Sequence, residues 1–242
     1  MTYRPTVSPE EAARMQAWHD EHYDYLKKVS EDGEVFDYLG LTLVVPPHVQ
    51  VIESTSDVLG SVVAGEARPG ERVLDMGTGS GVNAILAAKR GADVVAVDIN
   101  PYAVEAARAN AERNGVADKV AIARSDLFDE VEGRFDLVIF DPPFRWMKPR
   151  DWAEASITDE DYRALTAFFA HVREHLAEGG RVLVYFGTTA DLGYLEQLIE
   201  TNGLVGRVVS HRELEKDGHL VEYRAYRIEV ADLALPGSTV GA

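Results

Sequence analysis

The stretch Val73-Leu74-Asp75-Met76-Gly77-Thr78-Gly79-Ser80-Gly81 joins a predicted buried strand to a predicted helix through a loop with three glycines. Glycine lets the backbone turn tightly and lets a ligand approach the main chain closely. A dinucleotide-binding loop would read G-x-G-x-x-G, whereas this loop reads G-x-G-x-G and has Val82 at the third glycine position of that pattern. Asp75 places a carboxylate where a diphosphate would lie, which favours a ligand that carries an ammonium group. Taken alone, the loop is equally consistent with a tight turn.

Strand-like and helix-like segments alternate after this loop. Alternation with nearly continuous apolar strands predicts an α/β fold, in which helices cover both faces of a mainly parallel sheet. Segments 206–212 and 220–230 have no helix between them, and this predicts an antiparallel hairpin at one edge of the sheet. The other strands are predicted over 72–76, 93–99, 120–124, 135–140 and 181–186, and the helices over 82–90, 101–114, 159–177 and 190–201.

Residues 1–68 are predicted to form a helical and hairpin extension that caps the active site. Its first helix begins at Pro9, is capped by Ser8 and extends to about Val29. Trp18 and His19 on this helix are expected either in the core or in a cap over the cofactor pocket. A hairpin around residue 40 and a helix over 56–64 follow. The main domain is predicted over 69–232, and a flexible tail over 233–242.

Acidic residues follow two further strands at the edge where the glycine loop lies. Asp98 ends the second strand, and a carboxylate there accepts both hydroxyls of a ribose in nucleoside-binding α/β folds. Asp126 follows the third strand, in position to meet an adenine amino group. The other predicted cofactor contacts, apart from the loop glycines and Asp75, are Thr78, Asn83, Ile99 and Leu127.

The turn Asp141-Pro142-Pro143-Phe144 ends the fourth strand at the same edge. An amide or ring-attached NH2 group is a poor nucleophile because its lone pair is delocalised. The Asp141 carboxylate and a proline carbonyl are suited to accept both N–H hydrogens, since prolines fix the turn and carry no competing N–H. Phe144 is suited to stack on a flat acceptor. These four residues are therefore the predicted catalytic site, although an isolated Asp-Pro-Pro turn is usually a strand end.

The segment after this turn, 145–152, contains three cations and two tryptophans. Interleaved aromatic and basic residues are typical of sites for flat anionic or nucleobase-like molecules. Arg145, Trp146 and Lys148 are therefore the predicted substrate-binding residues. A lid packed on the sheet edge would explain the same composition equally well.

The order of D-M-G-T-G-S-G, V-D-I-N-P-Y-A, S-D-L-F and F-D-L-V-I-F-D-P-P-F resembles that of the class I S-adenosylmethionine-dependent methyltransferases over residues 68–230. It is most similar to the small-domain group with the release-factor glutamine methylases and the ribosomal-RNA guanine-N2 methylases. The resemblance implies a Rossmann-like sheet of seven strands with an antiparallel last strand, and S-adenosylmethionine as cofactor. The glutamine methylases have Asn at position 141, whereas Asp is commoner in nucleobase amino methylases. The resemblance places Asp75, Gly77, Gly79 and Gly81 around the methionine moiety, Asp98 on the ribose and Asp126 near the adenine.

Composition limits the partners of the chain. Its 242 residues carry a formal charge of −17, which repels polyanions and argues against a nucleic-acid substrate. The chain has no cysteine, no apolar run of membrane-spanning length and no signal peptide, so we expect a cytoplasmic protein. The pattern H-x-x-E-H over 171–175 has no obvious third metal ligand, and no metal is expected.

The leading hypothesis is an S-adenosylmethionine-dependent N-methyltransferase whose acceptor is a planar amino or amide nitrogen of a small molecule or protein. One alternative is an RNA guanine or adenine amino-methyltransferase. From a different class, a nucleotide-dependent oxidoreductase or a non-catalytic nucleoside-binding protein also remains open. The sequence identifies neither the methyl acceptor nor the oligomeric state.

Overall fold

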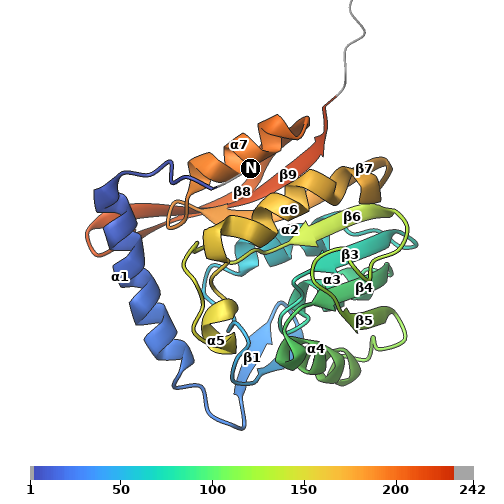
Figure 1. Cartoon of the computed structure of the whole chain (residues 1–242). Coiled ribbons are helices and arrows are strands. Elements are labelled where there is room, and N and C mark those ends of the chain that lie inside the picture. The colour runs from blue at the N-terminus through green and yellow to red at the C-terminus, as the bar shows by residue number, and fades with distance from the viewer. Residues whose placement is uncertain (1–2, 232–242) are drawn as a thin grey trace, which may run out of the picture.

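The computed structural model describes residues 3–231, which build a seven-stranded sheet of order β5-β4-β3-β6-β7-β9-β8 (Figure 1). Neighbouring strands pair in parallel except around β9, which is antiparallel to both β7 and β8. The prediction of a mainly parallel, Rossmann-like sheet with an antiparallel last strand is confirmed. The strands are β3 (Arg72–Met76), β4 (Asp93–Asp98), β5 (Val120–Arg124), β6 (Phe135–Phe140), β7 (Leu176–Gly187), β8 (Leu204–Lys216) and β9 (His219–Val230).

Helices cover both faces of the sheet. Successive strand residues point to opposite sides, so each inner strand packs against both helix layers. Leu137 and Ile139 of β6 pack with α2 (Asp57–Glu66), α3 (Val82–Lys89) and α4 (Pro101–Arg113). Val138 and Phe140 pack on the other face with α6 (Arg163–His171) and α7 (Leu192–Thr201) (Figure 1). Burial on both faces explains the nearly continuous apolar strands. Although α2 lies before residue 68, it is part of the helix layer of the main domain.

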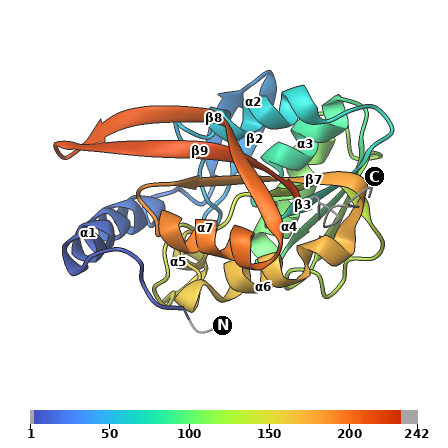
Figure 2. The ribbon, with the colours of Figure 1, turned by 90° about the horizontal axis from the view of Figure 1, so that it is seen from above.

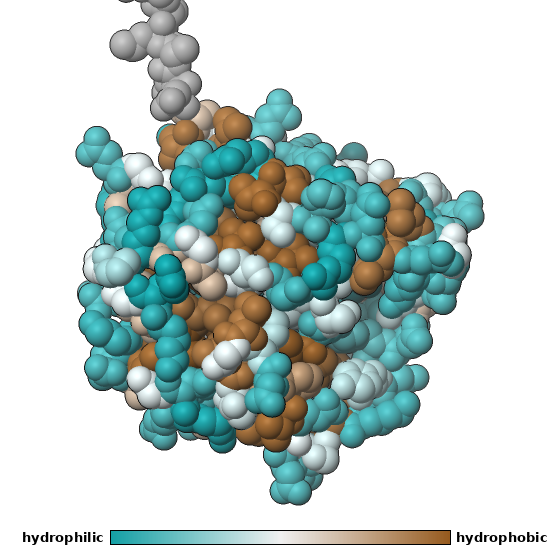
Figure 3. All heavy atoms as spheres, turned by 180° about the vertical axis from the view of Figure 1, so that it is seen from behind, coloured by the Kyte–Doolittle hydropathy of each residue, from teal (hydrophilic) through white to brown (hydrophobic). Residues whose placement is uncertain are grey.

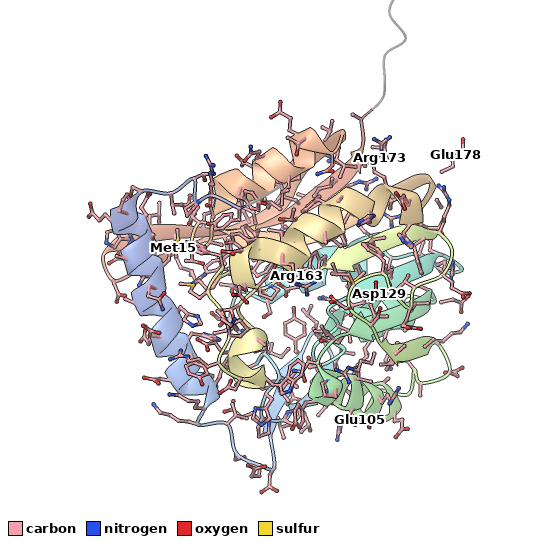
Figure 4. All side chains as sticks on the ribbon, viewed as in Figure 1. Met15, Glu105, Asp129, Arg163, Arg173 and Glu178 are labelled. Carbon is pink, nitrogen blue, oxygen red and sulfur yellow. The ribbon has the colours of Figure 1, made fainter. Side chains whose placement is uncertain are left out.

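The helix α1 (Pro9–Leu26) begins where the sequence predicts and ends three residues earlier than expected. Ser8 and Glu11 form a reciprocal capping box at its first turn. One face of the helix is buried, and Figure 4 shows Met15 on the side toward the body of the molecule. The buried residues on this face are Met15, Trp18, His19, Tyr23 and Leu26.

The hairpin of β1 (Glu34–Tyr38) and β2 (Leu41–Val45) packs on α4 rather than on the central sheet. Asn110 of α4 accepts a hydrogen bond from the Val44 N–H and donates one to the Val44 carbonyl, both at 2.9 Å. Its amide also donates to the Ser80 carbonyl at 2.9 Å. One buried asparagine therefore attaches the hairpin to the loop after β3.

The α1 helix bridges two distant parts of the chain. Near its middle, the Trp18 indole donates a hydrogen bond of 2.6 Å to Asp217, at the tip of the β8–β9 hairpin. The Nε2 atom of the neighbouring His19 lies 2.7 Å from a carboxylate oxygen of Glu154 in α5 (Trp152–Ala155). Figure 2 shows the long hairpin extending over α1. The α1 helix is thus attached both to the tip of the β8–β9 hairpin and to α5.

The predicted helix over 159–177 is wrong at its C-terminal end. The α6 helix stops at His171, a 3-10 turn η2 (Val172–His175) follows, and β7 begins at Leu176. Leu176 is buried and pairs with Phe135 of β6 before the register shifts. A Cβ atom on Gly180 would lie 2.8 Å from the Phe135 carbonyl oxygen, so the strands approach here through glycine. Gly179-Gly180 therefore bends a strand rather than ending a helix.

The rear face of the molecule carries separate apolar areas surrounded by hydrophilic residues (Figure 3). Within residues 3–231, no helix is both long and apolar enough to cross a membrane. The tail predicted over 233–242 lies outside the described residues.

Arg181 of β7 is a buried charge near the amino ends of the parallel strands, and its side chain is only 5% exposed. It donates hydrogen bonds to the carboxylates of Glu66 and Glu71 and to two backbone carbonyls. Removing one partner of a buried ionic network leaves the others unpaired and costs about 3–5 kcal/mol. We expect Arg181→Met to lower the free energy of unfolding by that amount in urea titrations. Arg212→Met, which removes a half-exposed ion pair with Asp57 and a hydrogen bond to the Ser54 carbonyl, should cost less, about 1 kcal/mol. Equal effects in the two variants would contradict this assignment.

Candidate active site

A cavity of about 480 Å³ opens at the carboxyl ends of β3, β4, β5 and β6. Its size is within the range of small-molecule sites, and ligands in open α/β sheets bind at this edge. The N-terminal segment contributes Trp18, His19 and residues 49–53 to one wall, and the β8–β9 hairpin contributes Lys216 and Tyr223. Residues of the N-terminal segment therefore line the cavity, while their role as a cap over the active site stays a prediction.

The glycine loop is held from behind by Asp75, which is 1% exposed. Its carboxylate accepts hydrogen bonds from the Thr78 hydroxyl at 2.6 Å and from the Ala84 N–H at 3.0 Å. Burial raises the pKa of Asp75 to about 7. Asp75 does not line the cavity, and neither does Gly81, whose Cβ would lie 3.0 Å from the Ala107 Cα. These two residues shape the loop rather than line the space.

The front of the loop fits a ligand that contacts the backbone. Gly79 has a φ of +54°, and a Cβ placed on it would meet no atom within 4 Å. Bare main chain therefore faces the cavity, as close approach of a cofactor requires. Of the predicted cofactor contacts, Gly77, Thr78, Gly79, Asn83, Asp98, Ile99, Asp126 and Leu127 line the cavity.

Asp98 connects the second strand to this loop. One carboxylate oxygen accepts from the Gly79 N–H at 2.9 Å, and the other accepts from the Asn100 N–H at 2.8 Å. Burial raises the pKa of Asp98 above its usual range despite these bonds. Each oxygen keeps a second lone pair for a ligand hydroxyl. The predicted ribose contact is therefore compatible with the geometry.

The turn after β5 brings Asp126 and Leu127 to the cavity, with Leu127 in the left-handed backbone region at a φ of +51°. Arg163 at the start of α6 pairs with the Asp126 carboxylate at 3.2 Å, and Figure 4 shows Arg163 below α6, near the centre of the molecule. This exposed ion pair occupies the edge where an adenine is predicted. Sequence reasoning did not identify Arg163.

The turn Asp141-Pro142-Pro143-Phe144 lies at the carboxyl end of β6, and all four residues line the cavity. The Asp141 side chain is exposed, but the surface it presents is that of the cavity, and no described residue donates a hydrogen bond to it. Enclosure by the protein and the nearby negative charges of Asp75 and Glu53 raise the pKa of Asp141 to about 8. Its oxygens are free for a ligand.

Phe144 belongs to an aromatic group beside Asp141. Its ring centroid lies 5.4 Å from that of Tyr185 and 6.2 Å from that of Tyr223. Its carbonyl accepts a hydrogen bond from Tyr162 at 2.8 Å, which holds the turn from the side of α6. Glu53, Tyr185 and Tyr223 also line the cavity, although no motif in the sequence pointed to them.

The three predicted substrate-binding residues separate in the structure. Arg145 lines the cavity and is buried. Trp146 lies outside the lining and packs against Tyr3 and Tyr162, with ring centroids 5.8 Å apart in both pairs. Lys148 is also outside the lining, exposed, and lies 3.5 Å from a carboxylate oxygen of Glu160. Of the three predicted residues, one therefore faces the cavity, one packs in an aromatic cluster and one is exposed.

Metal ligands do not gather in the described part of the chain, where no group of three or more His, Asp or Glu side chains could hold an ion. His175, from the pattern H-x-x-E-H, stacks on Phe128 with ring centroids 4.3 Å apart.

The family profile described as methyltransferase small domain matches residues 49–214. The chain belongs to this family. Membership confirms the predicted resemblance to the class I S-adenosylmethionine-dependent methyltransferases, which use S-adenosylmethionine as methyl donor. It does not support the oxidoreductase or the non-catalytic nucleoside binder. The roles of the individual site residues stay predictions.

Several methyltransferases share part of the sequence. A ribosomal protein L11 methyltransferase of Pelotomaculum thermopropionicum is 59% identical over 73 residues, which are 30% of this chain and 24% of that protein. A ribosomal RNA small subunit methyltransferase C of Chromohalobacter salexigens is 35% identical over 125 residues, which are 50% of this chain and 37% of that protein. The chain therefore spans between a quarter and two fifths of the length of these relatives.

Among solved structures, Trm5 of Methanocaldococcus jannaschii in complex with adenosine superposes with a TM-score of 0.62. The match covers 84% of this chain and 57% of that chain at 20% sequence identity. A likeness at this identity supports the fold alone.

The ribose contact predicted for Asp98 is testable by cofactor binding. Loss of a hydrogen bond to a charged group costs about 1.5–3 kcal/mol, and Asp98 also fixes the Gly79 N–H. We expect Asp98→Ala to weaken S-adenosylmethionine binding by about 10- to 150-fold in calorimetry. Asp129→Ala is the matched control, because Asp129 is an exposed aspartate in the segment that follows β5 (Figure 4). This variant should bind S-adenosylmethionine normally. Unchanged affinity in Asp98→Ala would remove the residue from the cofactor site.

Proposed function

We propose that this chain is an N-methyltransferase whose acceptor is a planar amino or amide nitrogen, held at Asp141. The observation that supports this most directly is the free Asp141 carboxylate at the end of β6, which faces the cavity beside Phe144 and the two prolines. An N–H pair needs acceptors, and Asp141 offers lone pairs and no hydrogen once it is ionised. A positively charged methyl donor bound nearby favours that ionised form, because an opposite charge lowers the pKa of a carboxylate. The Pro142 carbonyl supplies the second acceptor in this proposal.

S-adenosylmethionine, when bound, would supply a methyl carbon on a positively charged sulfur. The nitrogen lone pair would attack that carbon, and the carbon–sulfur bond would break to leave S-adenosylhomocysteine. Asp141 and the proline carbonyl hold the two N–H hydrogens, so that the lone pair tilts toward the methyl group. Alignment of reacting atoms contributes up to about 7–11 kcal/mol. Phe144 keeps the acceptor plane fixed. Once the new bond makes the nitrogen cationic, Asp141 stabilises that charge, and the nitrogen then passes one proton to water, directly or by way of Asp141.

We favour a small molecule or a protein side chain over RNA as the acceptor. The N-terminal segment walls the cavity, and the acidic lining residues include Glu53, Asp98 and Asp159. A polyanion gains its affinity from basic surfaces, whereas this chain has a formal charge of −17. The named relatives act on a ribosomal protein or on ribosomal RNA, and the Asp at position 141 is the feature that keeps an RNA base as the second candidate.

Two substitutions at Asp141 test the chemistry. Asp141→Ala removes one preorganised contact and should lower turnover by about 10²–10³. Asp141→Asn keeps one acceptor oxygen and should retain measurable activity. The acceptor is found first, by transfer of a labelled methyl group into metabolite, protein and RNA fractions, and cofactor affinity should stay close to wild type in both variants. Full activity of Asp141→Ala would mean that the turn only ends a strand.

The raised pKa of Asp141 has a consequence for stability that needs no acceptor. Folded Asp141 holds its proton up to a pKa of about 8, while its ordinary value is 3.8. The folded state therefore binds more protons than the unfolded state between these values, and Asp141 makes folding less favourable as the pH rises. We expect Asp141→Asn to unfold at a higher temperature than the wild type, with a larger gap at pH 8.5 than at pH 5.5. A gap that stays constant or shrinks with rising pH would contradict the raised pKa.

A further inference from the structure

Arg145 is a buried guanidinium without a partner. Its backbone is fixed, because its N–H donates to the Ile157 carbonyl at 3.3 Å and its carbonyl accepts from the Asp159 N–H at 2.7 Å. Its residue surface is only 9% exposed and lies on the cavity. Among residues 3–231, nothing accepts a hydrogen bond from its Nε or Nη1 atom. The burial lowers the pKa of this guanidinium from its usual range.

The same chain shows how a structural arginine is buried. Arg181 is enclosed to a similar degree, and two carboxylates and two carbonyls accept its hydrogen bonds. An unpaired buried charge has a high desolvation cost, and arginine cannot avoid that cost by losing its proton near neutral pH. A buried arginine that no structural partner satisfies is therefore suited to a partner that arrives from the cavity.

The surroundings of Arg145 define what that partner looks like. The Tyr185 hydroxyl is buried on the same cavity; Thr55 lies near it, but no described group meets hydrogen-bond geometry with it. The rings of Tyr185 and Tyr223 stack at 6.0 Å and 14°, next to Phe144. This part of the cavity thus combines two unused donors with flat aromatic walls. A planar guanidinium fork matches the two oxygens of a carboxylate or a phosphate.

We propose that the methyl acceptor is a small molecule carrying an oxyanion, a carboxylate or a phosphate, which Arg145 binds with the help of the Tyr185 hydroxyl. The proposal rests on the proposed function, in which Asp141 holds the nitrogen of the same molecule. Arg145 follows the Asp-Pro-Pro-Phe turn directly and lines the same cavity as Asp141, so in this proposal the two side chains bind two different groups of one planar acceptor. The acceptor is then a flat, anionic amine or amide.

Depth favours a small molecule over a macromolecule. Arg145 is buried rather than placed at the rim, so the anion has to enter the cavity with the group that it belongs to. Arg163, the other arginine of the lining, is already paired with Asp126. A nucleic-acid backbone would instead require basic groups at the surface.

Equilibrium binding tests this inference without methyl transfer. The protein loaded with S-adenosylhomocysteine is titrated by NMR with benzoate, with benzamide as its neutral counterpart, and with inorganic phosphate. We expect benzoate or phosphate to bind at least about 10-fold more tightly than benzamide, and Arg145→Met to remove this preference. Arg145→Lys keeps the charge without the fork and should bind at an intermediate level. Arg207→Met, at an exposed position of β8 outside the cavity lining, should behave as wild type.

Two further readouts keep the result decisive. Arg145→Met should raise the thermal unfolding temperature of the ligand-free protein, since it removes an unpaired buried charge; this also shows that the variant folds. Its affinity for S-adenosylhomocysteine should stay normal. A loss of that affinity would mean that Arg145 holds the carboxylate of the cofactor, and equal binding of benzoate, phosphate and benzamide by wild type would also overturn the proposal. Neither result depends on Asp141, so the N-methylation proposal is tested separately.

Discussion

The buried Asp75 carboxylate fixes the turn from β3 into α3, and the position of the cavity depends on that turn. It accepts from Thr78 at one end of the loop and from Ala84 in the first turn of the helix. The Thr78 N–H donates to the Val97 carbonyl of β4 at 2.9 Å, which links the loop to the next strand. Asp98 at the end of that strand binds the Gly79 N–H in return. Two carboxylates thus hold one loop from both sides and leave its bare backbone toward the cavity.

The opposite wall depends on a second buried carboxylate. Burial would raise the pKa of Glu154, but hydrogen bonds from Arg150 and His19 outweigh it and lower the pKa to about 2. The Arg150 backbone and guanidinium donate three bonds of 2.6–2.7 Å to this group. Since His19 lies on α1 and Glu154 on α5, this network attaches the N-terminal helix to the segment that follows the Asp-Pro-Pro-Phe turn. The wall formed by the extension is therefore anchored where the acceptor is proposed to bind.

Local sequence signals predicted most of the fold and many of the residues that line the cavity near the glycine loop. Ser8 and Pro9 mark the start of α1, and the strand ends at Asp98 and Asp141 lie at one edge because parallel strands share it. Contacts between distant segments carried no such signal, as in the bond between Trp18 and Asp217, 199 positions apart. Glu53 and Tyr185 reach the cavity through packing of this kind.

The segment after the turn shows the same limit at the level of single residues. Arg145 and Trp146 are neighbours in the sequence, and both are predicted to bind the substrate. In the structure, the parallel bridge between Arg145 and Thr158 fixes the backbone, with the guanidinium on the cavity and the indole in an aromatic cluster with Tyr3. Composition predicts which chemical groups a segment offers, while the direction of each side chain depends on a pairing with residues more than ten positions away.

The distribution of charge in the cavity gives the proposed reaction a direction. Enclosure by the protein, together with the negative charges of Asp75 and Glu53, raises the pKa of Asp141, so this part of the cavity resists further negative charge and favours a cation. A cationic methyl donor therefore favours ionisation of Asp141, and by linkage an ionised Asp141 favours the donor by the same factor. The demethylated product has lost the positive charge on sulfur and no longer gains this stabilisation. In the proposed site, the Asp141 carboxylate that holds the acceptor nitrogen would thus also discriminate between the donor and its product, which would favour release of the product after transfer.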